Sequence, residues 1–363
     1  MKPASLSMQN AIELPLDNTA QRRIITLIKT LLMTGLIAAG LTASEANAAN
    51  GKVQQIKLVN TGTIGSAGEK YSRTIARHLY RFIPGKPKIT VQSIVGAGGI
   101  KATNFAYNAM PRNGLNILLP PDTIILSQAL WPKAVKYNPS HFSWIGSVSA
   151  ANRVFALRTD TKFKLAKDIR GQRLAIGYTN RADMSYIIPK LMREIVKTDI
   201  RLVAGLKTAR KTIAEMEKNT HVGAAFDWLT WNTIVPHWFK KTGNFAIPLV
   251  QVGYYRDPLL KKLPMLHEIT NKQDHTLVKL VSTPGAIGYS LLLPPRSPKG
   301  ALKVLRAAFD KMVKDPQFIG YIRTQRLRLL PTSGEKIQNI VADAVKTTSK
   351  SNKARLRSII FAK

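Results

Sequence analysis

Two short glycine-rich stretches hold residues whose types and spacing could bind an anion. The first contains Thr63, Ser66 and Ala67, and the second ends in Gly98 and Gly99. Each stretch lies between a run typical of a strand and a run with helical periodicity, so free backbone N–H groups and a hydroxyl should lie at a helix start. Such donors suit a carboxylate. Alternatively, the glycines only permit tight turns.

Further polar residues follow two later apolar runs. Thr179, Asn180 and Arg181 come after the first of these runs, and Asp227 directly follows the second. Arg181 could bind a carboxylate through two parallel hydrogen bonds, or could be an ordinary exposed arginine. Asp227 could bind an amine or hydroxyl of a ligand, or could close the pocket wall together with Trp228. We predict that these four polar residues bind the ligand opposite the glycine-rich stretches.

Residues for other kinds of chemistry are missing from the sequence. There is no cysteine, and no two of the six histidines stand at HxxH or HxxxH spacing, so neither a metal site nor a cofactor is expected. No paired carboxylates, Ser-His-Asp order or GxSxG motif is present, so the chain is not expected to be an enzyme. Glu69 and Arg73, four residues apart on an expected helix, favour a structural salt bridge.

The charge of the chain is strongly positive. Lysine and arginine total 55 against 20 acidic residues, which gives a net charge of +35. The positive residues are spread along the chain without a recognised nucleic-acid motif, so we expect no nucleic-acid partner. A generally basic surface suits an acidic medium or anionic lipid head groups. A basic protein that binds polyanions at a surface is the alternative.

The N-terminal segment 1–48 has the pattern of a secretory signal peptide. Arg22, Arg23 and Lys29 precede an apolar run over 30–43, and Ala46 and Ala48 are spaced as a signal peptidase requires. The apolar run is shorter than a membrane-spanning helix. We therefore expect export to the periplasm with cleavage near Ala48. A signal segment that is retained as a membrane anchor is the alternative.

The elements that must position the candidate residues alternate between strands and helices. At 363 residues the chain is long enough for two domains. The patterns predict an α/β protein whose ligand-facing loops lie at the carboxyl ends of parallel strands. We expect strands over 53–59, 88–95, 115–119, 174–178, 222–226 and 246–254, and helices over 69–82, 100–110 and 208–218 and from Pro298 onward.

Several segments together resemble the substrate-binding proteins of tripartite tricarboxylate transporters, the Bug family. The most specific is Val95-Gly96-Ala97-Gly98-Gly99 with the later turn Pro111-Arg112-Asn113-Gly114, which is similar to the family's PGAGG…P-x-D-G signature. The matches run from about residue 53 to 340. The sequence departs from the family pattern at Val95, Glu69, Asn113 and His267. Other matching segments are Gly65–Glu69 with Arg73, Phe142–Gly146, Lys167–Gly171, Leu263-Pro264, Leu293–Pro295 with Pro298, and Asp315-Pro316.

The resemblance implies a two-lobed type II periplasmic-binding-protein fold, with mixed sheets flanked by helices and a central cleft. Lobe 1 would comprise 53–156 and 256–363, and lobe 2 would comprise 157–255. It further implies a monomer that closes its lobes around a small carboxylate, or another small polar ligand, and delivers it to membrane transporter subunits. A sensor that presents its ligand to a two-component kinase is the alternative.

Overall fold

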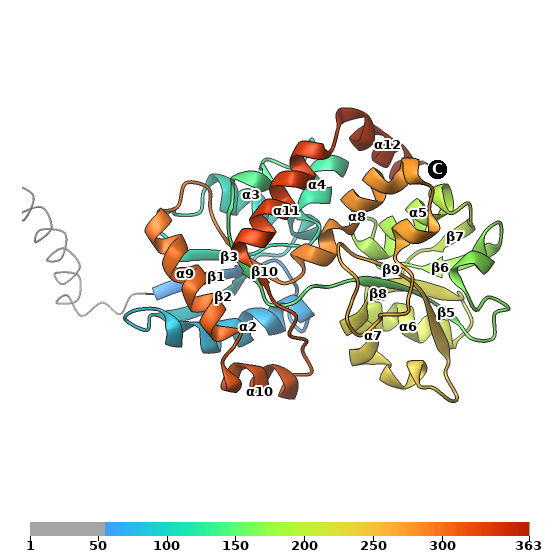
Figure 1. The fold of residues 1–363 in the computed structure, drawn as a ribbon, viewed down its shortest axis with the longest axis horizontal. Coiled ribbons are helices and arrows are strands. Elements are labelled where there is room, and N and C mark those ends of the chain that lie inside the picture. Colours follow the sequence, from blue (N-terminus) through green and yellow to red (C-terminus); the bar gives the residue numbers. More distant parts are fainter. Residues whose placement is uncertain (1–54, 363) are drawn as a thin grey trace, which may run out of the picture. The chain divides into compact units, whose positions relative to one another are not determined.

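Two β-sheets with helices packed against them form the part of the chain that the computed structural model describes, residues 55–362 (Figure 1). The proposed signal segment and its cleavage site lie outside these residues. Within them, no helix has both the length and the apolar character needed to cross a membrane.

The first sheet has six strands in the order β11-β4-β10-β3-β1-β2. β1 pairs in parallel with both β2 and β3, whereas β10 runs antiparallel between β3 and β4. The parallel part therefore brings three strand ends to one edge. The strands are β1 (Gln55–Asn60), β2 (Lys88–Ser93), β3 (Asn116–Leu119), β4 (Ser143–Ser147), β10 (Ser290–Leu293) and β11 (Thr332–Ser333).

The second sheet has five strands in the order β7-β6-β8-β5-β9, all within residues 153–252. β6 is parallel to β8, and β5 is antiparallel to both β8 and β9. The lobe boundaries at 156 and 256 stay predictions. The strands are β5 (Arg153–Arg158), β6 (Arg173–Gly177), β7 (Asp199–Val203), β8 (Gly223–Asp227) and β9 (Ala246–Val252).

Most helices connect strands, whereas the last two follow the final strand. The helices are α2 (Ala67–Leu79), α3 (Ile100–Asn108), α4 (Ile124–Leu130), α5 (Met184–Ile195), α6 (Ala209–Glu217), α7 (Trp228–Ile234), α8 (His275–Ile287), α9 (Lys299–Met312), α10 (Pro316–Thr324), α11 (Gly334–Thr347) and α12 (Lys350–Phe361).

Two expectations need correction. The helix expected from Pro298 onward begins one residue later, at Lys299, and Pro298 occupies its N-cap position. The strand expected over 88–95 ends at Ser93, because the chain turns there into the glycine-rich stretch. The apolar run 142–157 contains two strands, β4 and β5, which belong to different sheets.

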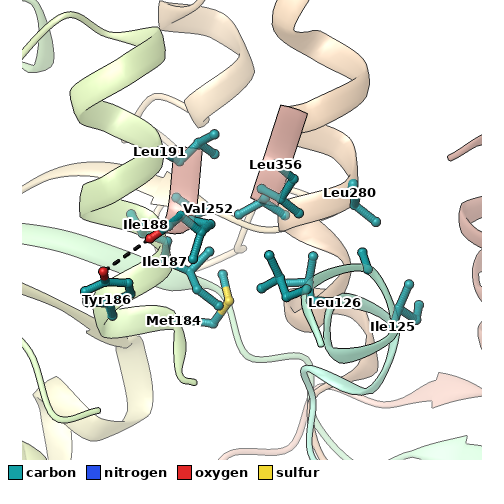
Figure 2. Close-up of a cluster of buried hydrophobic side chains, with 14 of the residues drawn as sticks. Ile125, Leu126, Met184, Tyr186, Ile187, Ile188, Leu191, Val252, Leu280 and Leu356 are labelled. Carbon is teal, nitrogen blue, oxygen red and sulfur yellow. Dashed lines mark hydrogen bonds between the residues drawn. The ribbon is translucent and has the colours of Figure 1, made fainter. Parts of the chain in front are cut away.

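An apolar core joins helices from both sheets on the side of α12. The C-terminal helix α12 packs on α4, which follows β3, and on α5, which follows β6. The Tyr186 hydroxyl donates to the carbonyl of Ile360 at 3.2 Å, and Arg357 Nη1 donates to the carbonyl of Ala129 at 2.9 Å. Figure 2 shows buried side chains of this cluster, among them Ile125, Leu126, Met184, Ile187, Leu191, Leu280 and Leu356.

Buried polar groups hold together the segments through which the chain passes between the sheets. Asn152 Nδ2 donates to Gln251 Oε1 at 3.0 Å and to the carbonyl of Tyr255 at 2.7 Å. The same Gln251 oxygen accepts from the backbone N–H of Asp257 at 2.9 Å. Asp257 is 2% exposed and pairs with Arg328 through both carboxylate oxygens. These contacts connect the two crossing segments, near residues 152 and 255, to each other.

We expect His78 on α2 to make the stability of the protein depend on pH. Burial lowers the pKa of His78, and the neighbouring Arg81 and Arg77 lower it further, whereas Asp315 opposes them. The folded state thus binds the proton less tightly than the unfolded chain, whose histidine has an ordinary pKa of 6.5. We expect stability to fall as pH decreases through 6.5. His78→Phe, which keeps the packing on Phe318, should narrow the melting-temperature difference between pH 7.5 and pH 5. An unchanged difference would contradict this.

Candidate site at the strand ends

The first half of the candidate site lies where β1, β2 and β3 end. Because these strands are parallel, the segments that follow them share one edge of the first sheet. Asn60 ends β1 and organises this edge. Its Nδ2 donates to Ser93 Oγ at 3.0 Å and to the carbonyl of Gly62 at 3.1 Å, while its Oδ1 accepts from the Gly62 N–H at 2.8 Å.

The first glycine-rich stretch forms the N-terminus of α2. Ser66 is the N-cap, and its Oγ accepts from the backbone N–H of Glu69 at 3.3 Å. The Ser66 hydroxyl hydrogen remains available to a ligand. Thr63 is exposed, and Ala67, the first residue of the helix, is half-buried. The expected salt bridge between Glu69 and Arg73 is confirmed.

The second glycine-rich stretch, residues 96–99, is a run of four positive φ angles. Gly98 has φ +61° and Gly99 has φ +89°, so both need the left-handed region that glycine adopts without strain. A Cβ on Gly99 would lie 2.7 Å from Cγ of Pro121, which follows β3. A Cβ on Gly98 would lie 3.2 Å from Cβ of Ala182, which belongs to the loop after β6 in the second sheet. The stretch therefore fits tightly between loops of both sheets.

Gly99→Ala should destabilise the protein by about 1–3 kcal/mol, because it combines left-handed strain with a clash against a rigid proline ring. The matched control is Gly300→Ala in α9, where a Cβ would meet no atom within 4 Å. The control should be neutral or slightly stabilising. Urea denaturation measures both. Equal stabilities for the two variants would contradict the observed packing of Gly99.

The second half of the site lies at one edge of the second sheet. β6 and β8 are parallel and end there, and β5 begins there because it is antiparallel to β8. Thr179 and Asn180 follow β6, and both donate to Asp183, the N-cap of α5. The hydrogen bond from Asn180 Nδ2 to Asp183 Oδ2 measures 3.1 Å, and Asn180 Oδ1 accepts from the N–H of Ala182 at 2.8 Å. These side chains shape the loop. Their contact with a ligand stays a prediction.

Arg181 and Asp227 occupy different environments at this edge. Arg181 is exposed and forms no ion pair within residues 55–362. Asp227 caps α7, and its oxygens accept from the N–H and hydroxyl of Thr230 at 2.8 and 2.7 Å. In the β5–β8 register, Asp227 is the direct neighbour of Arg153.

Arg153 and Asp122, which the sequence analysis missed, connect the two halves. Asp122 follows β3 in the first sheet and accepts a hydrogen bond from Arg153 Nη2, at the start of β5 in the second. Their side chains are only 19% and 15% exposed. Arg153 Nη1 also donates to the carbonyl of Ala151 at 3.0 Å. The sequence does contain a signal that could have identified them. Each is a charged residue at the boundary of an apolar run: Asp122 ends NILLPPD, and Arg153 begins RVFAL.

Several acidic groups surround this arginine. Burial raises the pKa of Asp122, and the Asp227 and Asp183 carboxylates add to the effect, while Arg153 opposes it. Burial alone would lower the pKa of Arg153, but the Asp122 and Asp227 carboxylates have a larger effect, so the pKa of Arg153 is raised. Arg153 therefore stays charged at any physiological pH. Its largely buried side chain thus places a permanent positive charge between the strand ends of both sheets.

A stacked tyrosine pair borders the same region. The rings of Tyr71 and Tyr289 lie 3.9 Å apart, and the Tyr71 hydroxyl donates to the carbonyl of Arg328 at 2.7 Å. Burial raises the pKa of Tyr289, and the nearby Asp227 carboxylate raises it further. The Tyr289 hydroxyl therefore stays protonated and can donate a hydrogen bond, whereas the Tyr71 hydroxyl already donates to Arg328. No group of three or more His, Asp and Glu in residues 55–362 is arranged to hold a metal ion.

Comparison with known proteins shows the fold. No family model and no curated protein matches the sequence. A TctC solute-binding protein from Polaromonas superposes with a TM-score of 0.64 at 13% identity, over 86% of this chain and 99% of that one. The MatC protein of Rhodopseudomonas palustris with bound malate gives 0.57 at 16% identity, over 85% and 99%.

A third solved structure, a protein of R. palustris with adipate, gives a TM-score of 0.59 at 15% identity, over 85% of this chain and 99% of that one. The described part of the chain therefore has the two-lobed fold of periplasmic binding proteins. The predicted fold class is confirmed.

Proposed function

We propose that the protein is an exported, periplasmic solute-binding protein of the Bug type that holds a small carboxylate between the strand ends of its two sheets. The observation that carries the proposal is the set of contacts around the end of β3. Gly99 lies against Pro121, the neighbouring Asp122 pairs with Arg153, and Gly68 in the first turn of α2 lies next to Leu119. The malate and adipate bound to two proteins of the same fold support this ligand class.

Each half of the site would supply a different kind of group. The first sheet would supply backbone N–H groups around Ala67, Gly98 and Gly99, with hydroxyls from Thr63 and Ser66, to one carboxylate. The second sheet would supply Arg153 and Arg181 as cations, and Asp227 with Thr179 and Asn180 as hydrogen-bonding groups for the rest of the ligand. A dicarboxylate or an amino acid would engage both halves.

Closure around the ligand would be the working motion. The chain passes between the sheets near residues 152 and 255, where few residues would need to change their dihedral angles. A ligand that bridges the sheets favours the closed form by its differential affinity. Delivery to membrane transporter subunits would follow, without chemical conversion of the ligand.

A thermal-shift screen tests this function. The panel should contain dicarboxylates such as malate and adipate, amino acids and aromatic acids, with neutral sugars and duplex DNA as comparisons. A true ligand stabilises the folded state in proportion to the logarithm of its concentration. We expect at least one carboxylate to raise the melting temperature. Stabilisation by DNA alone would replace this function with binding of polyanions.

A further inference from the structure

A groove of about 690 Å³ lies away from the candidate site, between the 164–167 turn and the 258–264 segment. Most of its fourteen lining residues are apolar, and none is acidic. Leu165 is 55% exposed and Leu259 is 69% exposed, so both leucines project into solvent. Among residues 55–362 such exposure of a large apolar side chain is uncommon, and here two occur in one groove.

Lysines surround the exposed leucines. None of them forms an ion pair within residues 55–362, although Lys164 Nζ donates to the carbonyls of Thr159 and Thr161 at 2.6 and 3.1 Å. Two lie on each side of the groove: Lys164 and Lys167 in the turn, and Lys261 and Lys262 in the segment.

The nearest acidic groups are engaged elsewhere. Asp168 accepts from the backbone N–H groups of Lys164 and Leu165, at 3.0 and 2.8 Å, so its carboxylate stabilises the turn. Glu268 pairs with Arg256. The groove therefore presents a net positive charge around an apolar centre, since Asp168 offsets only one of its four lysines.

We propose that this groove docks on an anionic phospholipid bilayer. Its two leucines would enter the layer below the head groups, while Lys167, Lys261 and Lys262 contact lipid phosphates. The two leucines are exposed and have lysines on both sides. This arrangement fits the wide anionic surface of a bilayer better than a single acidic protein segment, which would contact the lysines of one side. The net charge of +35 acts in the same direction. Docking would hold the protein beside the membrane independently of its ligand.

Co-sedimentation with vesicles tests the proposal. One set contains equal parts of phosphatidylglycerol and phosphatidylcholine, and the other contains phosphatidylcholine alone. Lys261→Gln/Lys262→Gln should weaken partitioning onto the anionic vesicles on the order of tenfold, because each lysine near an anionic surface contributes several-fold. Leu165→Asn/Leu259→Asn should weaken it to a similar extent without any change in charge.

The matched control is Lys303→Gln/Lys311→Gln on α9, which removes the same charge from exposed lysines outside the groove. All proteins carry the same N-terminal segment, so differences between them report the substituted positions. The control should change partitioning less than about twofold. An equal loss in the control, or groove variants that bind like the wild type, would overturn the proposal.

Insertion can be measured separately because the chain has no cysteine. Leu259→Cys provides a single attachment point for an environment-sensitive fluorophore, and Val304→Cys on α9 provides the control. Anionic vesicles should shift the emission of the label at position 259 to shorter wavelength and leave position 304 unchanged. Identical responses at both positions would overturn insertion through the groove.

Discussion

Replacing Arg328 with methionine should lower the free energy of unfolding by about 3–5 kcal/mol, because it leaves the Asp257 carboxylate buried without its partner. Asp257 is 2% exposed, and Arg328 donates to both of its oxygens, with Nη2 at 2.6 Å from Oδ1. The backbones of the two residues make further hydrogen bonds: the Asp257 N–H donates to Gln251 Oε1, and the Arg328 carbonyl accepts from the Tyr71 hydroxyl. Urea denaturation of the purified protein measures the loss.

The matched control is Lys279→Met, which breaks the ion pair with Asp343. That pair is about half exposed on both sides, so water screens it and its loss should cost less than about 1 kcal/mol. Asp257→Asn combined with Arg328→Met should recover part of the stability, because the buried charge is then removed. Equal losses for Arg328→Met and Lys279→Met would contradict a buried pair at the crossing segments.

Replacing Arg153 with methionine should weaken ligand binding by roughly tenfold to a hundredfold, since a hydrogen bond to a charged group contributes about 1.5–3 kcal/mol. Arg153 is the half-buried cation between the two sheets, and it also holds Asp122 in place. Calorimetric titration with the carboxylate found by thermal shift measures the change. The variant's unfolding curve shows whether it remains folded.

Arg181→Gln distinguishes the roles of the two candidate arginines of the site, Arg153 and Arg181. If the exposed Arg181 binds the ligand carboxylate, this variant also loses affinity, whereas an ordinary surface arginine leaves it unchanged. Wild-type affinity in Arg153→Met would remove Arg153 from the site. Loss in both variants would mean that the two cations share the ligand.

The alternation of strand, glycine-rich loop and helix was readable from the sequence because it depends on local patterns. The glycines at 98 and 99, the cap at Ser66 and the pairing of Glu69 with Arg73 all follow from short-range spacing. The periodicity of apolar residues likewise located most strands of both sheets to within two residues.

The tertiary pairing was not readable. Asp122 and Arg153 meet because the fold brings the end of β3 next to the start of β5, although these strands belong to different sheets. Nothing local marks the chain crossing between β4 and β5 within one apolar run. Asp257 and Arg328 lie 71 residues apart in sequence. Contacts of this kind depend on the topology, which single-residue patterns do not encode. The sequence analysis also did not predict that Thr179 and Asn180 donate to Asp183. Several polar residues lie close together in this loop, and the sequence alone does not say which of them bond to one another.

Hydrogen–deuterium exchange with and without the stabilising carboxylate tests the central claim most directly. A ligand held between the sheets should slow exchange simultaneously in both halves of the site, at 62–68 and 96–100 in the first and at 178–183 and 227–230 in the second. Protection in only one half, or protection confined to the lysine-lined groove at 164–167 and 258–264, would contradict binding between the two sheets.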